Sequence, residues 1–540
     1  MKTAKKLLAI VLACVLALTA LSVPAFAAEE VTSDIEQSFY QVVDKLVVSV
    51  LKVLNFFIPG INWTNKWPTT KTYQTPDGFY AGENVFDYDV TDDSVWSCGY
   101  AYASLLDGLN IYDGTYYMAG TLEVMNGRVP TKVFDDQGVT VYAISDGTSG
   151  IVVHAVIDGY GLARGDVLEI RNRLADFAKE NDIIAINVSV LHQHSGIDIL
   201  GMGAPLLPAL LSNPIKSILG FDTTELIGGK NTTFMTNMYN VVAQAVKDAV
   251  NDMTEGTLSY GYVDADEYIY DKREPIVLDT NLNRFRFVPY DKNENEIWLV
   301  EAGIHCVGIG AGPDIITADF PYYLKEYINE ETGADVAYIQ GAELAITTDY
   351  TNITAGEGKD QERIRTYGKA LGDLVISINN DIELDPVLNI AITETTVVAD
   401  NQILILAVRE GLLNSVVEKD GLGYNVISEV GYMELGSEYT VGVVMAPGEI
   451  APEIIWGGAT TAEDSWMGTS WDYNSLADMT GADKVICFGL VNDQIGYILP
   501  DNDYRSMFTE NEEINAVSKT AGSTVANAFA ELVDSVKRFV

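Results

Sequence analysis

The chain has 540 residues, 48% of them hydrophobic, which is enough apolar material for one large core or for several domains. The formal net charge is −44 and no segment is rich in lysine or arginine, so nucleic acid is excluded as a partner, because phosphate contacts need a basic surface. An anionic bilayer would be repelled for the same reason. Such acidity is typical of a highly solvated surface.

The first residues are typical of a secretory signal. A lysine-rich start precedes an apolar run over 7–21, and Ala25-Phe26-Ala27 offers a small-x-small cleavage site. We expect a signal peptide over 1–27, cleavage near Ala27/Ala28, and a protein that is secreted or held at the cell surface. A retained membrane anchor is the alternative, which the shortness of the apolar run disfavours.

The cysteines do not predict a disulfide framework. Cys14 would leave with the signal, and Cys98, Cys306 and Cys487 are an odd number without a CxxC pair. Cys306 and Cys487 lie in apolar runs and are predicted to be core residues.

A helix and a loop precede the main domain. Apolar residues recur at helical spacing over 34–58, and a segment rich in Trp, Pro, Asn, Gly and Thr follows over 59–82. Polar residues interrupt the apolar pattern, so the helix is predicted to pack on the main domain. Peripheral contact with a membrane through residues 34–58 is the alternative. The chain is therefore divided into 1–27, an N-terminal helical extension and linker over 28–90, and a main domain over 91–540.

From about residue 95 strands alternate with helices. The predicted strands are 139–144 and 150–157, which form a hairpin around Asp146-Gly147, then 184–194, 284–288, 297–307, 390–398, 402–408, 440–446 and 484–490. The predicted helices are 164–181, 237–253, 318–329, 361–378 and 515–540. An apolar, proline-broken stretch over 201–215 is predicted to be a loop that could line an apolar cleft. This mixture predicts an α/β (mixed α+β) fold, one large domain with mixed sheets flanked by helices.

Histidine is scarce, since the chain has four. His192 and His194 end the strand predicted over 184–194, and a period of two places both on the face of its buried aliphatic residues. Two imidazoles that project together suit a Zn²⁺ ligand with a neighbour for proton transfer, although the H-x-H pattern alone favours two ordinary histidines equally. His305 follows another apolar strand, in a glycine-rich loop that lacks the Gly-Lys-Ser/Thr of a P-loop. His154 lies inside a strand and is predicted to be a core histidine.

Four segments, in order, resemble the catalytic domain of the neutral (non-lysosomal) ceramidases. The segment 187–196 resembles that family's strand ending in His-Thr-His-Ser-Gly. Residues 302–305 with Ala318-Asp319-Phe320-Pro321 resemble its second histidine strand and its Asp-Phe-Pro helix start. The segment 445–449 resembles its Pro-Gly-Glu turn, and 489–497 its Gly-Leu-x-Asn segment that ends in tyrosine. The resemblance runs from about residue 95 to 510 and implies that the 91–540 domain is catalytic.

The resemblance also implies a ligand set for Zn²⁺, namely His192, His305, Glu449 and Tyr497. It implies that His194 assists proton transfer or binds the developing oxyanion. Taken alone, Glu449 would read as a surface carboxylate and Tyr497 as a core phenol.

Two further segments bear on the substrate. Arg273, within Lys272-Arg273-Glu274-Pro275, resembles the family's Arg-Ser-Pro segment, which implies a contact with a substrate oxygen; a solvated arginine is the alternative. The segment 338–348 departs from the family, because its Gly-Asp-Val-Ser-Pro is missing and Thr347 is only a loose substitute for the serine.

The activity implied by the resemblance is hydrolysis of the N-acyl amide bond of ceramide, or of a similar N-acyl lipid, by metal-activated water. Two alternatives stay open: a zinc hydrolase of another amide or ester, and a non-catalytic binding protein on the same scaffold. The sequence does not set the oligomeric state.

Overall fold

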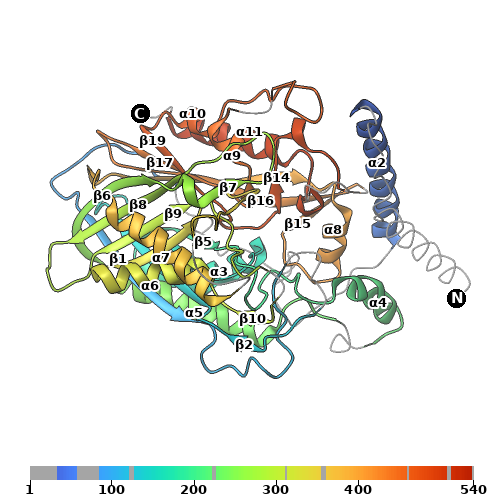
Figure 1. The fold of residues 1–540 in the computed structure, drawn as a ribbon, viewed down its shortest axis with the longest axis horizontal. Helices are drawn as coiled ribbons and strands as arrows, with labels where there is room; N and C mark the ends of the chain where they lie inside the picture. The colour runs from blue at the N-terminus through green and yellow to red at the C-terminus, as the bar shows by residue number, and fades with distance from the viewer. Residues whose placement is uncertain are drawn as a thin grey trace, which may run out of the picture.

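The computed structural model describes residues 33–57, 84–120, 127–221, 227–310, 313–353, 360–421, 423–458, 461–507 and 513–537. The expected signal peptide and the loop predicted over 59–82 lie outside these ranges. The described chain forms one large mixed α/β domain, as predicted, with two extended sheets and helices on their outer sides (Figure 1). Among the described helices, none combines the length and apolar character that a membrane span requires.

The larger sheet has nine strands. Their order is β11-β9-β8-β6-β1-β3-β4-β5, with β13 beside β6. The strands are β1 (Trp96–Ser104), β3 (Gly138–Ser145), β4 (Ile151–Ile157), β5 (Ile183–Val190), β6 (Thr254–Asp264), β8 (Asn281–Pro289), β9 (Ile297–Ala302), β11 (Asp335–Gln340) and β13 (Ile382–Leu384). The pairs β4–β5 and β9–β11 are parallel.

A second sheet of five strands has the order β14-β16-β17-β19, with β15 on β16. Its strands are β14 (Leu388–Val398), β15 (Val417–Asp420), β16 (Gly423–Leu435), β17 (Val441–Met445) and β19 (Lys484–Phe488). Three two-stranded sheets join β2 (Lys132–Val133) to β10 (Ile315–Ile316), β7 (Ile269–Asp271) to β12 (Ile346–Thr348), and β18 (Glu449–Ile450) to β20 (Tyr497–Ile498).

The helices cover these sheets or connect them. They are α2 (Ser33–Phe57), α3 (Arg164–Glu180), α4 (Leu206–Ile218), α5 (Thr232–Asn251), α6 (Phe320–Thr332), α7 (Gln361–Ser377), α8 (Gln402–Arg409), α9 (Pro452–Trp456), α10 (Leu476–Thr480) and α11 (Ala521–Lys537). Short 3₁₀ turns lie at Asp266–Tyr268, Asp501–Asp503 and Glu513–Asn515.

Alternation along the strands divides the core into layers. In β3, Val141 and Ala143 pack with residues of α3 and α5, whereas Tyr142 and Ile144 pack with Met433 and other residues of the second sheet. On the far side of the second sheet its side chains pack against α11. The two sheets therefore lie face to face, with helices on both outer faces.

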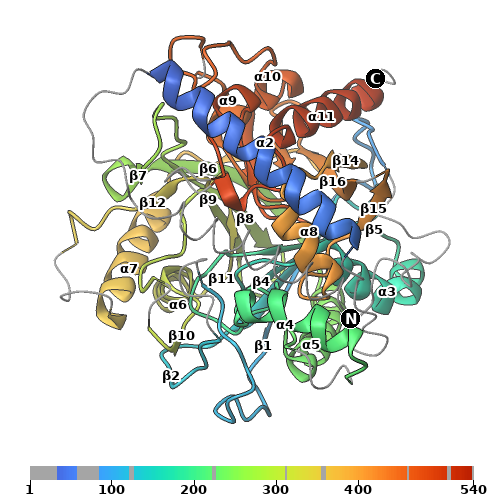
Figure 2. The same ribbon diagram turned by 90° about the vertical axis from the view of Figure 1, so that its right-hand side faces the viewer.

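Helix α2 lies across the surface of the domain, over α8 (Figure 2). Val47 and Leu51 are buried against Ile403, and the side-chain amide of Asn55 donates to the backbone carbonyl of Gln402 at 3.0 Å. The prediction that this helix packs on the main domain is confirmed. Its contact with a membrane stays a prediction.

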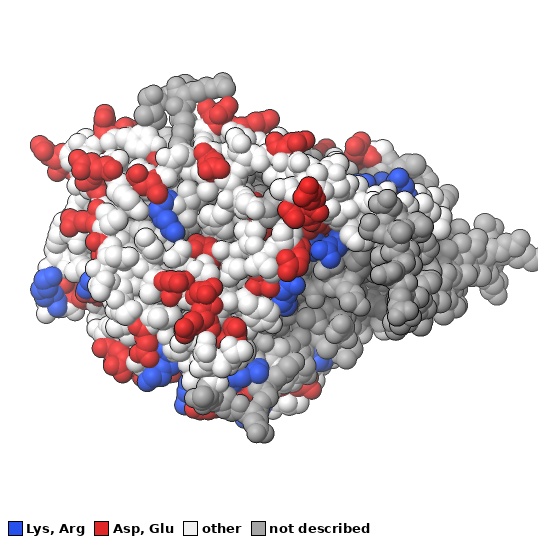
Figure 3. Space-filling view, turned by 45° about the horizontal axis from the view of Figure 1, so that its top comes forward, with Lys and Arg blue, Asp and Glu red and all other residues white. Residues whose placement is uncertain are grey.

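The described surface is acidic. Asp and Glu side chains are spread over the face shown in Figure 3, with fewer Lys and Arg between them. The three cysteines of the main domain are free and buried, and the prediction of core positions for Cys306 and Cys487 is confirmed.

Two predicted elements are wrong. The strand predicted over 402–408 is helix α8: the side chain of Asn401 accepts hydrogen bonds from the backbone N–H groups of Ile403 and Leu404, and this cap starts a helix in a β-branched apolar run. The loop predicted over 201–215 contains helix α4, which keeps Pro214 inside it. Sequence analysis also missed the long strands β6 and β16, whose polar residues obscure the alternation.

Candidate metal centre

Several strands end at one place, and the segments that follow them are joined. Asn492, after β19, pairs with Val188 of β5: its backbone N–H donates to the Val188 carbonyl at 2.7 Å, and its side-chain oxygen accepts from the Val188 N–H at 2.9 Å. Gly489 donates to the carbonyl of Gln340, at the end of β11, at 2.8 Å. Carboxyl ends of neighbouring strands are the usual location of sites in α/β folds.

The predicted ligands meet at these strand ends. His192 follows β5, His305 follows β9, and Glu449 begins β18 just after β17. Among the described residues, every group with metal-ligand spacing lies here. One group contains His192, His194 and His305; the other contains His192, His305, Glu343 and Glu449.

His192 and His305 each turn one ring nitrogen toward backbone carbonyls. Nδ1 of His192 is 2.6 Å from the carbonyl oxygen of Tyr160. Nδ1 of His305 is 2.9 Å from the carbonyl oxygens of Glu343 and Ile346. A carbonyl only accepts, so each Nδ1 carries a proton and donates it, and Nε2 of the neutral ring is left as an acceptor.

Both Nε2 atoms face the same carboxylate oxygen. Each lies 3.3 Å from Oε2 of Glu449. With neutral rings, three buried acceptor atoms meet with no donor between them, an arrangement that needs a cation. Ligands about 2.0–2.2 Å from a tetrahedral zinc ion are about 3.3–3.6 Å from one another, so the spacing of these side chains fits zinc.

Protonation competes with a metal for the same atoms. Burial lowers the pKa of His192 to about 3, although Glu449 opposes the shift. Burial also disfavours the cation at His305, but the carboxylates of Glu343 and Glu449 outweigh it and raise the pKa of His305 to about 9. Burial tends to raise the pKa of Glu449, and the two histidines bring it below its usual value. Without a metal, a proton on His305 therefore bridges to Glu449.

The backbone is strained where it presents these groups. His192 has φ +55°, and Ala345, Leu490 and Asn492, in adjoining segments, are also in the left-handed region. Such conformations cost roughly 1–3 kcal/mol each in non-glycine residues and persist where the surroundings impose them. The predicted strand ends at Val190, so the period-two argument for His192 and His194 is wrong.

His194 nevertheless lies beside His192. The two ring centroids are 4.7 Å apart and the rings are almost perpendicular. Both ring nitrogens of His194 are buried and have no hydrogen-bond partner among the described residues. Burial lowers the pKa of His194 well below its usual value, and the positive charges of His305 and Lys272 add to the shift. The side chain is therefore neutral and free to bind another molecule.

Tyr497 is placed next to Glu449. The two residues are partners in the parallel pair β18–β20, and side chains of paired residues project to the same face. Tyr497 is buried. Its role as the fourth ligand stays a prediction.

Arg273 is held by carboxylates of its own chain. Its guanidinium donates to Asp503 Oδ2 at 2.9 Å and to Glu513 Oε1 at 3.1 Å, and all three side chains are buried. These bonds tie the segment after β7 to the two 3₁₀ turns near the end of the chain. The predicted contact of Arg273 with a substrate oxygen is not part of this arrangement and stays a prediction.

Sequence analysis missed three residues of the centre. Tyr160 stacks on His192 with ring centroids 4.6 Å apart. The side-chain amide of Gln494 donates to Oε1 of Glu449 at 3.0 Å. Glu343 lies in the segment that departs from the ceramidases, where it is the one carboxylate within the apolar stretch 336–346. A single carboxylate in an apolar stretch was the sequence feature that could have marked Glu343 as a candidate site residue.

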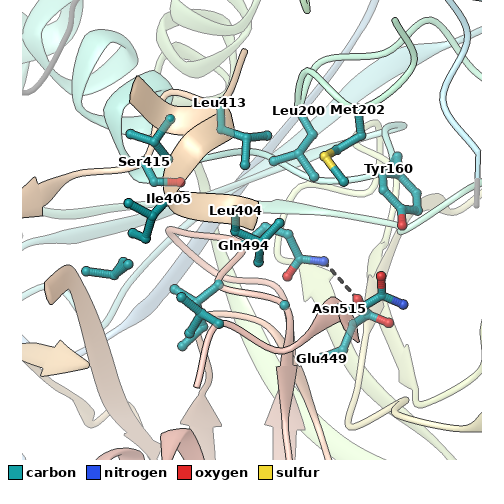
Figure 4. A pocket seen from close by; sticks show the side chains of 15 residues that line it. Tyr160, Leu200, Met202, Leu404, Ile405, Leu413, Ser415, Glu449, Gln494 and Asn515 are labelled. Atoms are coloured by element: carbon teal, nitrogen blue, oxygen red, sulfur yellow. Dashed lines mark hydrogen bonds between the residues drawn. The ribbon is translucent and has the colours of Figure 1, made fainter. Parts of the chain in front are cut away.

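An apolar pocket opens beside Glu449 (Figure 4). Its wall is formed by Leu200, Met202, Leu404, Ile405, Val408 and Leu413, with Tyr160 and Gln494 near the carboxylate. The cavity volume is about 60 Å³. Since a buried water needs about 10–15 Å³, the cavity as it stands holds a few waters and is too small for a long acyl chain.

No family model matches this sequence, and no curated protein matches it. Solved structures do. The chain is similar to neutral ceramidase from Pseudomonas aeruginosa, with 14% identity and a TM-score of 0.60 over 83% of this chain and 75% of the other. It is also similar to a ceramidase complexed with C2, with 12% identity and a TM-score of 0.59 over 83% of this chain and 76% of the other. These findings confirm the predicted resemblance to the neutral ceramidases at the level of the fold.

Proposed function

We propose that this protein is a zinc-dependent hydrolase that cleaves the N-acyl amide bond of ceramide or a similar N-acyl lipid. One observation carries the proposal: Nε2 of His192, Nε2 of His305 and Oε2 of Glu449 meet at the ligand spacing of zinc, within the fold of a ceramidase.

The chain would hold zinc with His192, His305 and Glu449, and with Tyr497 as the fourth ligand. When bound, the ion supplies Lewis-acid activation of water and of the substrate carbonyl. The bonds from Nδ1 to backbone carbonyls fix the tautomer and orientation of both histidines, and Gln494 holds the other oxygen of Glu449.

His194 is assigned the proton transfer. Its ring is buried and both nitrogens lack a partner among the described residues, so a lone pair is open to the proton of the attacking water. Burial makes the ring a weak base, and the negative charge that develops on the substrate oxygen would raise its proton affinity during the reaction. The ring can then return this proton to the leaving nitrogen, which lets the amine depart neutral. While protonated, it also stabilises negative charge on the substrate oxygen.

The apolar pocket is assigned to the acyl chain. Its wall comes from α8 and from the segment after β5, and the pocket reaches Glu449. Its small volume requires side chains of α8 to move before a long chain enters.

The test is release of fatty acid from a panel of N-acyl sphingoid lipids, with and without a chelator. We expect activity that chelation abolishes and zinc restores, and one zinc per chain. The absence of chelator-sensitive release over the whole panel would sink the lipid assignment.

The altered 341–348 segment favours a second candidate, a zinc hydrolase of another amide or ester. A panel of non-lipid amides and esters separates the two, because activity confined to ceramides contradicts the second. A third candidate, a binding protein without catalysis, predicts no turnover of any substrate.

We also propose export of the protein and removal of residues 1–27. The basic start, apolar run and Ala25-Phe26-Ala27 site support this. Intact mass measured on protein from the culture medium and the cell envelope tests it, since the mature chain should begin near Ala28.

A further inference from the structure

A second carboxylate is buried at the metal centre. Glu343 follows β11 and its side chain is fully buried. Oε2 accepts a hydrogen bond from the side-chain amide of Gln340 and lies 3.8 Å from Nδ1 of His305. Oε1 is buried and, within the part of the chain that the structure describes, has no hydrogen-bond partner. One carboxylate oxygen lies within 4.8 Å of ligand atoms of His192, His305 and Glu449.

Charge balance points to a ligand role. Two carboxylates, Glu343 and Glu449, lie near one another out of water, and in the described part of the chain their ion-pair partners are histidines only. Nearby buried carboxylates repel, and a buried charge without compensation destabilises the fold. One divalent cation between two carboxylates and two neutral imidazoles leaves the site without net charge.

We propose that Glu343 is a metal ligand, so that the centre offers its divalent cation two histidines and two glutamates, in addition to the Tyr497 proposed above. This inference rests on the proposed function for the presence of the metal, and goes beyond it in the donor set. It assigns a role to the segment in which this chain departs from the neutral ceramidases.

The side chain and the backbone carbonyl of Glu343 have different roles, so a substitution can test the side chain alone. His305 is oriented by the backbone carbonyl of Glu343, at 2.9 Å from Nδ1, and Glu343→Gln leaves that bond in place. The glutamine oxygen can still accept from Gln340. The variant therefore removes one negative charge and one ligand oxygen while it preserves shape and the support of His305.

Glu301→Gln is the matched control. Glu301, in β9, is also a buried carboxylate, and its Oε2 accepts from the Asn283 amide at 2.7 Å. It belongs to neither group with metal-ligand spacing. Both variants therefore remove a buried carboxylate charge, but only Glu343→Gln removes a proposed metal ligand.

The measurements are zinc affinity by competition with a chelator, the visible absorption spectrum of the Co²⁺ form, and melting temperature with and without zinc. For Glu343→Gln we expect zinc affinity to fall by at least about tenfold and the cobalt spectrum to change. We expect zinc to raise its melting temperature less than that of the wild type, while its metal-free form melts no lower. Glu301→Gln should keep the wild-type affinity and spectrum.

Unchanged zinc affinity together with an unchanged cobalt spectrum in Glu343→Gln would overturn the assignment while leaving the zinc centre intact. A wild-type protein that takes up neither zinc nor cobalt would overturn the proposed function as well. If Glu343→Gln does not melt cooperatively, Glu343→Asp replaces it as the test variant. Aspartate keeps the negative charge but is one methylene shorter, so its oxygens lie farther from the metal. A ligand role of Glu343 predicts an altered cobalt spectrum for this variant, and a purely structural role predicts an unchanged one.

Discussion

Comparison of the candidate metal centre with the core around His154 shows which features distinguish a candidate site from an ordinary buried histidine. His154 lies in β4, next to Asn187 of β5, a few residues before His192. Its ring is buried and stacks on Tyr142 with centroids 5.0 Å apart, and neither nitrogen has a hydrogen-bond partner in the described ranges. In the core between the sheets it packs on the rings of Tyr142 and Phe488 and lies beside Asn187. His192 and His305, in contrast, share a carboxylate. Burial and unpaired nitrogens are therefore common to both regions, and convergence on a carboxylate is what distinguishes the centre.

The largest expected effect is loss of the metal. His305→Ala removes a ligand and leaves Glu449 without one of its two histidine contacts, so we predict that zinc falls from one per chain to a small fraction and that hydrolysis is lost. His154→Phe is the control, since phenylalanine can keep the stacking on Tyr142, and it should retain zinc. Metal content is measured after dialysis against a weak chelator. Equal zinc content in the two variants would contradict the comparison.

The next effect separates metal binding from proton transfer. His194→Ala removes a ring that makes no hydrogen bond with any residue that the structure describes, so zinc should stay bound. We predict that kcat falls by about 10²–10⁴, the usual contribution of a general acid–base group. The measurement is kcat on an N-acyl lipid at equal zinc loading. Loss of zinc in step with activity would instead make His194 a ligand.

The comparison also predicts a pH dependence of stability. Burial lowers the pKa of His154 to about 3, whereas an unfolded histidine titrates near 6.5. Between these values the unfolded chain binds a proton that the folded chain excludes, so His154 destabilises the fold as pH falls from about 6.5 toward 3, by about 1.4 kcal/mol per pH unit, and has no effect above that range.

His154→Phe should therefore lose stability less steeply than the wild type below pH 6.5. Urea unfolding at a series of pH values from 8 to 4, on metal-free protein, measures the difference. Parallel curves for the two proteins would show that His154 is protonated in the folded state, which would contradict the lowering of its pKa by burial.

Sequence analysis named residues of the candidate centre but did not show why they come together. His192, His305 and Glu449 were named together because their motifs resemble those of the neutral ceramidases in the same order along the chain. Without that resemblance, Glu449 would have been taken for a surface carboxylate. The convergence of these three residues depends on pairing between β5, β11 and the segment after β19, which are far apart in sequence. The left-handed turn at His192 could not be read from the H-x-H pattern.

The errors have physical causes. In 402–408 the apolar run is rich in β-branched residues and favours a strand locally, but Asn401 caps a helix there and α2 packs on its outer side. Glu343 was missed because its segment was judged only by the serine it lacks. Arg273 was chosen because it is the positively charged residue of a motif. Its contacts with Asp503 and Glu513 could not be foreseen, because these residues lie more than 200 positions later in the chain.

The smallest expected effect is on KM and concerns the pocket wall, part of which is formed by α8. Leu404→Trp should fill the cavity and displace part of a long acyl chain. Loss of one or two buried methylenes, at about 0.8 kcal/mol each, predicts a KM about four- to fifteen-fold higher for long-chain amides, with little change for an acetyl amide and no change in zinc content. Val53→Trp, on the exposed side of α2, is the matched control. An equal rise in KM for long and short chains would show that the acyl chain lies outside this pocket. The metal centre would be unaffected, because Leu404 lies in α8 and the proposed ligands lie outside that helix.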